Sequence, residues 1–345
     1  MTTAHAPLIV GLAGTRLGPD ESAFLRDVRP FGIILFARNI ETGAQVRDLL
    51  GAAQDASGAP LTLVDQEGGR VQRVRPPLAP RQPPGAQVGA AAARNPANAA
   101  RIGWLSGRLV AGDVAPLGFN TPCLPVADVP VEGAHDVIGD RAYGHDPAHV
   151  ARVAAAVAEG VLAAGCLPVV KHIPGHGRAT ADSHFSLPTV RASRAELERD
   201  FAPFQALAHL PLAMSAHVTF SAIDDTPATL SPKVVGEVIR QQIGFDGLLM
   251  TDDISMRALR GDLGTLSRRA LDAGCDAVLH CNGKMREMRT IADALPPMAT
   301  AAQRRLDAAC AALRPADAAD LDALRAEFAA LVEADAKAPT ETAGG

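Results

Sequence analysis

Three histidines, a lysine and an aspartate lie close together in the segment KHIPGHGRATADSH, which spans Lys171 to His184. Its glycines and its proline exclude a helix and the interior of a sheet, so these side chains must lie on a loop. An aspartate near a histidine, as Asp182 is near His184, fixes the ring tautomer and favours the protonated ring. Such a pair can donate a proton to a leaving group and later take one from water. A surface Asx turn around Asp182 explains the same spacing equally well.

The same segment allows two other kinds of chemistry. His172 and His176 are four residues apart, which on a helix would suggest a metal-binding pair, but Pro174 and the flanking glycines do not allow that helix. We therefore expect no metal site. Lys171 could form a Schiff base with a carbonyl substrate. A lysine beside a histidine is equally suited to hydrogen bonding with a polyhydroxylated ligand.

Other polar side chains, most of them ionisable, follow short apolar segments along the chain. They are Asp65, Glu67, Arg70, Arg73, Asp128, His217, Asp252, Asp253, His280 and Asn282. The segment GFDGLLMTDD delivers two carboxylates directly after a buried apolar run. Because neighbouring residues of a strand point to opposite faces, only one of Asp252 and Asp253 can be catalytic. The other would cap the next helix or anchor the turn.

The apolar segments themselves predict the fold. Eight of them are hydrophobic throughout rather than alternating, which is typical of strands buried on both faces of a parallel sheet. They are 7–14, 32–36, 61–67, 119–126, 166–172, 212–218, 247–253 and 277–282. Helical patterns lie between them, and Asn95-Pro96 and Asp146-Pro147 are predicted helix starts with an N-cap residue before a proline.

Eight alternating units predict a single-domain α/β protein, a (β/α)₈ TIM barrel. The alternative is an open doubly wound sheet, but no GxGxxG motif follows the first strand to support it. In a barrel of this kind, catalytic groups gather at the carboxyl ends of the strands. The polar residues that follow the apolar segments should therefore converge on one mouth. We expect the barrel domain to span residues 1–333 and the tail 334–345 to be disordered.

Composition excludes several classes of protein. The net charge of −5 arises from intermixed acids and bases, and no basic stripe favours a nucleic acid or an anionic membrane surface as partner. We also find no signal-like start and no apolar stretch long enough for a membrane helix, so we expect a cytoplasmic location. The five cysteines form no Cys-X-X-Cys pair, which argues against a disulfide framework or a zinc knuckle.

Four motifs together resemble glycoside hydrolase family 3, in particular its single-domain bacterial β-N-acetylhexosaminidases of cell-wall recycling. They are VDQEGGRVQR, IGDRAYG, KHIPGHGRATADSH and MTDDISM, which occur here in the order of the family. The resemblance runs from the first strand to about Gly283. Ile173 stands where relatives usually have Phe, and Thr251 stands where many have Ser.

The resemblance implies a role for each matching position. Asp252 corresponds to the nucleophile, His184 to the acid/base residue and Asp182 to its dyad partner. The residues that correspond to those holding the N-acetylglucosamine ring are Asp65, Arg73, Arg141, Lys171 and His172. His176 and Arg70 fall within the motifs without an assigned role.

The activity implied by the resemblance is that of a retaining exo-β-N-acetylglucosaminidase. It would remove terminal non-reducing N-acetylglucosamine from peptidoglycan fragments, GlcNAc-1,6-anhydro-MurNAc and its peptides, through a covalent glycosyl-enzyme and without a cofactor. We expect a monomer whose partner is a small carbohydrate or muropeptide. The alternatives are a β-glucosidase or a phosphorolytic enzyme on the same barrel, a lyase that uses Lys171, and a sugar-binding barrel without activity.

Overall fold

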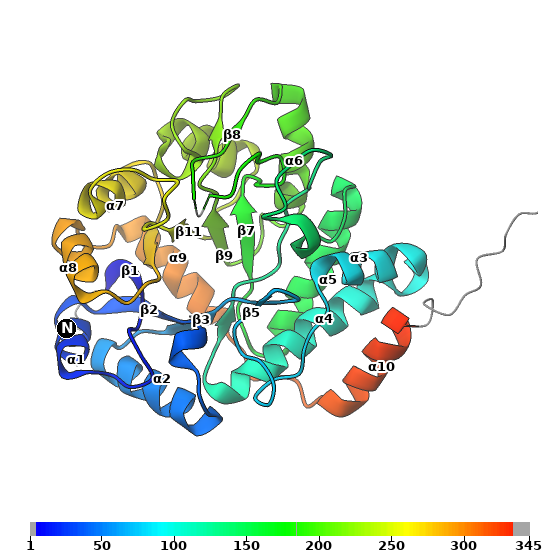
Figure 1. The fold of residues 1–345 in the computed structure, drawn as a ribbon, viewed down its shortest axis with the longest axis horizontal. Helices are drawn as coiled ribbons and strands as arrows, with labels where there is room; N and C mark the ends of the chain where they lie inside the picture. Colours follow the sequence, from blue (N-terminus) through cyan, green and yellow to red (C-terminus); the bar gives the residue numbers. More distant parts are fainter. Residues whose placement is uncertain (1–4, 184, 334–345) are drawn as a thin grey trace, which may run out of the picture.

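The computed structural model describes residues 5–183 and 185–333, and its centre is a barrel of parallel strands (Figure 1). The strand order is β6-β3-β2-β1-β12-β11-β9-β7. The barrel strands are β1 (Ala6–Gly11), β2 (Pro30–Leu35), β3 (Leu61–Val64), β6 (Thr121–Pro122), β7 (Val169–Ile173), β9 (Leu212–Ser215), β11 (Leu248–Asp253) and β12 (Ala277–His280). Each overlaps a predicted segment, and β1, β2 and β7 extend one or two residues beyond theirs, so the prediction of eight parallel strands is confirmed.

The ring closes between β6 and β7. A parallel bridge joins Val126 to Lys171, and the Val169 amide donates a hydrogen bond of 2.8 Å to the Leu124 carbonyl. Backbone pairing therefore continues around the whole barrel. This closure confirms the (β/α)₈ barrel and excludes the open doubly wound sheet.

Helices surround the barrel and form the return connections. They are α1 (Pro19–Val28), α2 (Gly43–Ser57), α3 (Gly85–Arg94), α4 (Ala99–Val114), α5 (Pro147–Ala163), α6 (Arg194–Ala206), the π-helix η6 (Val234–Gln242), α7 (Leu263–Asp272) and α8 (Met285–Ala294). Two further helices, α9 (Thr300–Ala311) and α10 (Leu321–Glu333), follow the last strand. Short 3₁₀ turns are η1 (Ala37–Asn39), η2 (Pro96–Asn98), η3 (Ala115–Leu117), η4 (Gly139–Arg141) and η5 (Ala228–Leu230).

One of the two predicted N-caps is confirmed and the other is wrong. The Asp146 carboxylate accepts a hydrogen bond of 2.7 Å from the His149 amide at the start of α5. Asn95 makes no such cap bond, because the 3₁₀ turn η2 intervenes before α4. The Asn95 side-chain oxygen instead accepts a hydrogen bond from the side chain of Asn98.

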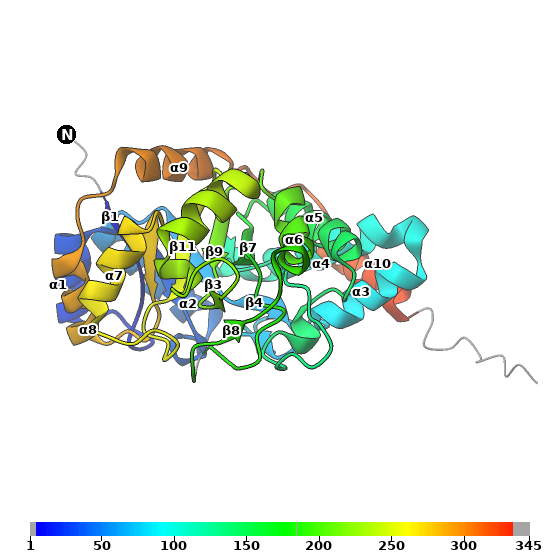
Figure 2. The same ribbon diagram turned by 90° about the horizontal axis from the view of Figure 1, so that it is seen from above.

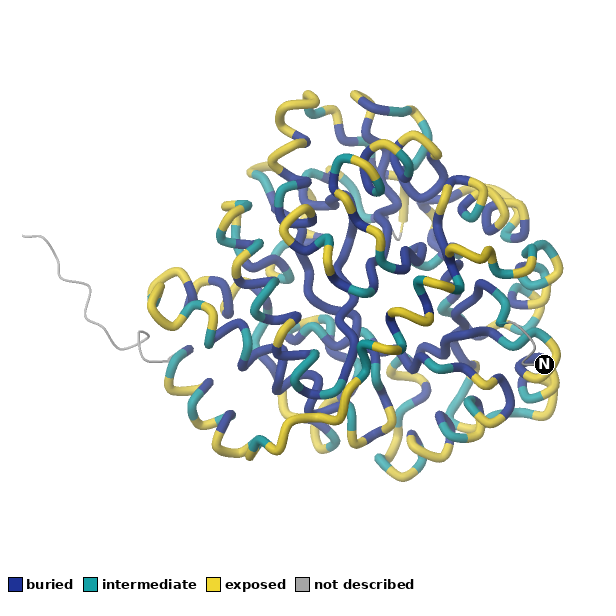
Figure 3. The backbone as a smooth tube through the Cα atoms, turned by 180° about the vertical axis from the view of Figure 1, so that it is seen from behind, coloured by how far each residue is buried: buried dark blue, intermediate teal, exposed yellow. Residues whose placement is uncertain are grey.

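The barrel strands are buried throughout, as the dark central tubes of Figure 3 show. Helix α9 crosses the end of the barrel where the strands begin (Figure 2), and its Leu306 packs among the side chains of the barrel interior. Arg305 of α9 also reaches Asp276, the residue before β12, at 2.8 Å. The barrel is therefore closed at this end, and a ligand must enter from the opposite one.

Helix α10 packs beside α4 and α3 (Figure 1). Its residues Leu324 and Phe328 are buried, as the predicted apolar face requires. Arg325 of α10 forms an ion pair with the buried Asp113 of α4, which fixes the helix to the barrel domain. The predicted disordered tail, 334–345, lies outside the described residues. Within residues 5–183 and 185–333, none of the helices has the length and apolar character required to cross a membrane.

Candidate active site

Six of the eight predicted site residues line one cavity of about 90 Å³ at the carboxyl ends of the strands. They are Asp65, Arg73, Arg141, Lys171, His172 and Asp252. Val71, Val137, His176, Ser183 and Met214 complete the lining. Asp182 directly precedes Ser183 on the loop after β7, but His184 lies outside the described residues. The proposed pairing of Asp182 with His184 therefore stays a prediction.

The two carboxylates that end β11 have different surroundings. Asp252 lines the cavity. The carboxylate of Asp253 accepts hydrogen bonds from the amide and hydroxyl of Ser255 and from the amide of Cys281. Asp253 thus anchors the turn after β11, as expected for a neighbour on the opposite face of the strand. Asp252 is left as the carboxylate that can act on a ligand.

Lys171, on β7, is a buried cation held by two carboxylates. Its Nζ lies 3.1 Å from Oδ1 of Asp65 and 2.6 Å from Oε1 of Glu67. Burial by itself would lower the pKa of Lys171, but these carboxylates outweigh it and raise the pKa above its ordinary value. The ammonium therefore stays protonated. Schiff-base chemistry needs a neutral amine, so this environment argues against a lyase.

Asp65 follows β3 and joins Lys171 to a second cation. Its Oδ2 lies 3.1 Å from Nη2 of Arg73. Burial by itself would raise the pKa of Asp65, yet Lys171 and Arg73 together hold it well below its usual range. Asp65 is consequently ionised at neutral pH. An ionised carboxylate between two cations presents acceptors and donors side by side, which suits the hydroxyl groups of a sugar.

Arg141, at the end of η4, is held by Glu67. The guanidinium Nε and Nη2 lie 2.8 Å from Oε2 and Oε1 of this carboxylate, a bidentate arrangement. Glu67 is deeply buried but does not line the cavity. Burial alone would raise its pKa, whereas Arg141 and Lys171 lower the pKa to about 2. Glu67 therefore acts on the cavity through the two cations.

Asp128 organises the histidines after β7. Its Oδ2 lies 2.7 Å from Nδ1 of His172, and its Oδ1 accepts a 2.7 Å hydrogen bond from the amide of His176. Nε2 of His172 lies 3.4 Å from Nη2 of Arg141, which can only donate. His172 must then accept at Nε2 and carry its proton on Nδ1, toward Asp128. One buried carboxylate thus sets both the tautomer of His172 and the course of the following loop.

His176 is a neutral residue of the cavity lining. Burial, with the neighbouring His172, lowers its pKa to about 4, despite the opposing influence of Asp128. Its Nε2 lies 3.1 Å from the hydroxyl of Ser183, so two parts of the loop after β7 are in contact at the cavity lining. Its Nδ1 is buried and has no hydrogen-bond partner within the described residues.

A hairpin between β4 (Gln66–Gly68) and β5 (Val71–Gln72) carries the acidic and basic residues that follow β3. The proline-rich loop that follows supports it, because the Gln72 side chain donates to the Pro80 carbonyl and accepts from the Gln82 amide. Gly68 has a φ of +98°, and a Cβ there would lie 2.3 Å from the Pro83 carbonyl oxygen. The hairpin can approach the loop this closely only with glycine.

Two of the polar residues that the sequence pointed to, Arg70 and His217, do not line the cavity. Two others, Glu67 and Asp128, hold cavity residues in place, although the sequence assigned them no role. Arg70 pairs with Asp140 at 2.7 Å and holds the segment before Arg141 rather than lining the cavity. His217 donates from Nε2 to the Asp253 carbonyl at 3.0 Å and supports the turn. Glu67 and Asp128 were recognised only as polar strand ends. Their partners are distant in sequence. The one available signal is that Asp65 and Glu67 are two residues apart, which on an extended chain puts their side chains on the same face.

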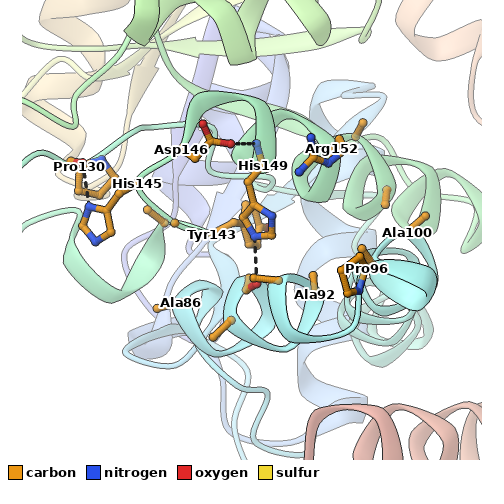
Figure 4. A pocket seen from close by; sticks show the side chains of 18 of the residues that line it. Ala86, Ala92, Pro96, Ala100, Pro130, Tyr143, His145, Asp146, His149 and Arg152 are labelled. Carbon is orange, nitrogen blue, oxygen red and sulfur yellow. Dashed lines mark hydrogen bonds between the residues drawn. The ribbon is translucent and has the colours of Figure 1, made fainter.

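A second hollow of about 1110 Å³ lies between α3, α4 and α5 (Figure 4). Its lining is mostly alanine and glycine with Tyr143, and none of the predicted site residues belongs to it. His149 spans it and donates from Nε2 to the Gly89 carbonyl at 2.9 Å. His149 therefore joins α5 to α3, while His145 binds the Pro130 carbonyl and Asp146 caps α5. No group of three or more metal-ligating side chains is placed to hold a metal ion in the described part of the chain.

Sequence comparison identifies related proteins. A family model described as the glycosyl hydrolase family 3 N-terminal domain matches residues 13–313. A β-hexosaminidase from Alkalilimnicola ehrlichii is 41% identical over 282 residues, which are 80% of each chain. A β-hexosaminidase from Bordetella parapertussis is 38% identical over 282 residues, also 80% of each chain.

Structure comparison agrees. NagZ from Neisseria gonorrhoeae, solved in complex with N-trifluoroacetyl-D-glucosamine, superposes with a TM-score of 0.83 at 29% identity, covering 95% of this chain and 96% of that one. A glycoside hydrolase family 3 β-N-acetylglucosaminidase from Paenibacillus sp. FPU-7 gives a TM-score of 0.78 at 29% identity, covering 98% of this chain and 64% of that one. The similarity therefore includes the whole barrel.

Proposed function

The chain belongs to glycosyl hydrolase family 3, and on that basis we propose that it is a retaining exo-β-N-acetylglucosaminidase. The observation that carries the proposal is the single cavity in which Asp252 faces the cations and carboxylates expected to hold a sugar. The β-hexosaminidase relatives and the glucosamine derivative bound by the Neisseria protein support N-acetylglucosamine as the sugar.

The proposed reaction proceeds in two displacements. A carboxylate oxygen of Asp252 attacks C1 of the sugar, and the bond from C1 to the leaving oxygen breaks as His184 gives that oxygen a proton. Water then attacks C1 of the glycosyl-enzyme, gives a proton to His184 and releases Asp252. Asp182 would favour the protonated ring in the first step. Two inversions at C1 retain the β configuration.

The size of the cavity supports action on a chain end. Its 90 Å³ lies well below the roughly 300–1,000 Å³ of ordinary ligand pockets, and the buried Met214 contributes to its lining. A terminal sugar could enter such a blind cavity after a modest opening of the loop. An internal sugar would need a through-going cleft.

The charges of the cavity favour hydrolysis over phosphorolysis. Arg73, Arg141 and Lys171 are already paired with the carboxylates of Asp65 and Glu67, and Asp252 adds a third carboxylate to the cavity lining. A phosphate would have to compete with carboxylates that already bind these cations. An uncharged sugar needs no such exchange, so we propose water as the acceptor.

We propose that the physiological substrates are peptidoglycan fragments, GlcNAc-1,6-anhydro-MurNAc and its peptides. This follows from the resemblance of the four motifs to enzymes of cell-wall recycling. A cytoplasmic monomer that acts without a cofactor, with the barrel domain extending over residues 1–333, belongs to the same proposal.

The function is tested with an aryl β-N-acetylglucosaminide and an aryl β-glucoside, with and without phosphate, while NMR follows the anomer released. We expect N-acetylglucosamine to appear first as the β anomer, and Asp252→Ala to lower kcat at least about 10⁴-fold. Asp262→Ala is the matched control, because Asp262 only caps α7. It should cost about 1 kcal/mol of stability and keep wild-type turnover.

A first-formed α anomer would exclude the two displacements. Sugar 1-phosphate as the product would favour a phosphorolytic enzyme, and preference for the glucoside would favour a β-glucosidase. Full activity of Asp252→Ala would refute the assignment of the nucleophile.

A further inference from the structure

Glu67 is shared by two cations of the cavity without reaching the cavity itself. Its Oε1 lies 2.6 Å from Nζ of Lys171 and 2.8 Å from Nη2 of Arg141, while its Oε2 lies 2.8 Å from Nε of Arg141. Its side chain is 5% exposed. A buried carboxylate in this place costs desolvation energy that its two partners must offset. Glu67 lies behind Lys171 and Arg141, the two residues that are expected to bind the sugar, so it is placed to hold both cations in position.

Glu67 fixes the orientation of the Arg141 guanidinium, as a count of its N–H groups shows. A guanidinium has five N–H groups. Two are directed to Glu67, one to Nε2 of His172 and one from Nη1 to the Val137 carbonyl. Within the described residues, these hydrogen bonds leave the second N–H of Nη1 without a protein acceptor, and Arg141 lines the cavity. Because the bidentate pair fixes the plane of the guanidinium, Glu67 decides where that proton points.

The same count applies to Lys171. Its ammonium has three N–H groups, of which one donates a hydrogen bond to Asp65, and it forms an ion pair with Glu67 at 2.6 Å. Within the described residues the hydrogen bond to Asp65 leaves an N–H group of Lys171 for the cavity, which Lys171 lines. Removal of either carboxylate would let the flexible side chain turn and would redirect that proton.

We propose that Glu67 is a positioning residue, which aligns one donor of Arg141 and one of Lys171 on the same sugar. The inference rests on the proposed function, because it takes the sugar as the ligand of both donors. It predicts that Glu67 contributes to binding and leaves the chemical step untouched. A loss of that kind raises KM and preserves kcat, because the interaction is the same in the ground state and the transition state.

A merely structural role for Glu67 predicts a different result, and the barrel provides a matched control. Asp276 is also buried and is also shared by two cations, Arg240 at 2.6 Å and Arg305 at 2.8 Å. It lies at the opposite end of the barrel, before β12. Asp276→Asn therefore removes an equivalent buried charge far from the cavity and should lower stability without changing KM.

The experiment compares wild type, Glu67→Gln, Glu67→Asp and Asp276→Asn in the full chain. Steady-state kinetics use the aryl β-N-acetylglucosaminide, and calorimetry measures binding of free N-acetylglucosamine. In Glu67→Gln an amide NH₂ faces the donors of Arg141 or Lys171, so one cation must move. We expect KM and the Kd of N-acetylglucosamine to rise about 100-fold, with kcat within about threefold of wild type. Glu67→Asp keeps the charge but shortens the reach, so it should raise both about 10-fold.

Wild-type KM in either Glu67 variant would overturn the proposal, and Glu67→Asp alone decides it if Glu67→Gln does not fold. A lower kcat at unchanged KM would overturn it as well, and so would an equal rise of KM in Asp276→Asn. If the wild-type protein does not hydrolyse the glycoside, the proposed function fails, and the calorimetry still tests Glu67 separately. A wild-type protein that does not bind the sugar would overturn both.

Discussion

Asp128→Asn tests how the position of one proton affects the cavity. The substitution keeps the shape of the side chain. In the wild type, Oδ1 of Asp128 accepts a 2.7 Å hydrogen bond from the His176 amide, and the carbonyl oxygen of the asparagine can keep this bond. The new NH₂ group then faces Nδ1 of His172, where the carboxylate accepts at 2.7 Å. Two donors cannot bond, so the His172 ring must move its proton to Nε2 or turn away.

The magnitude follows from the contacts that are lost. A hydrogen bond to a charged group contributes about 1.5–3 kcal/mol, so the free energy of unfolding should fall by about 2 kcal/mol. A proton on Nε2 would face Nη2 of Arg141, which lies 3.4 Å away and also donates. The displaced guanidinium would misplace the sugar, and kcat/KM should fall about 100-fold.

The assay combines urea unfolding, steady-state kinetics and NMR of the protein with ¹⁵N-labelled histidine. In the wild type, His172 should carry its proton on Nδ1, and in Asp128→Asn on Nε2. The matched control is Asp113→Asn, because Asp113 is also buried but binds Gln82 and Arg325 away from the cavity. That variant should lose stability and keep its kcat/KM. An Asp128→Asn protein with wild-type kcat/KM and an unchanged His172 proton would refute the reasoning.

Further predictions concern packing and acid stability. Gly89→Ala should destabilise the protein by more than about 2 kcal/mol, because the new Cβ would lie 1.7 Å from the Tyr143 carbonyl oxygen. Gly51→Ala, in open space on α2, should stabilise the protein by up to about 1 kcal/mol. Thermal unfolding measures both variants, and equal effects on stability would contradict the close approach at Gly89. Acid should also destabilise the fold. Because the pKa of Glu67 in the folded state, about 2, lies below its unfolded value, the native form binds fewer protons, and its contribution is lost as the pH falls from about 5 to 2. The urea concentration at the midpoint of unfolding should decline over that pH range, and it should decline less steeply in Glu67→Gln than in the wild type. Parallel plots of midpoint against pH for these two proteins would contradict the role of Glu67 in acid stability.

The barrel could be predicted from the sequence because its signal is local. Segments such as 247–253 are apolar throughout, and a strand buried on both faces requires that composition. Once the strands are placed, the topology brings their carboxyl ends together. Asp65, Lys171 and Asp252 could therefore be assigned to one site without knowledge of any contact.

The parts that could not be predicted depend on contacts between distant residues. Glu67 meets Arg141 and Asp128 meets His172 across long stretches of sequence, and no spacing within a motif shows which carboxylate will face which cation. The expected cap at Asn95 failed for a local reason, because a proline turn can form a 3₁₀ segment as readily as the first turn of an α-helix. The position of α9 across the barrel floor likewise follows from packing alone.

The barrel floor sealed by α9 has a consequence for the order of events in each catalytic cycle. A molecule bound in the cavity beside Met214 and Asp252 must leave through the same opening by which substrate enters. In the proposed reaction the released aglycone must clear that route before the sugar can follow, so free N-acetylglucosamine should be the last species to leave. It should accordingly compete with incoming substrate, and its accumulation would slow the enzyme in proportion to how tightly the cavity holds it.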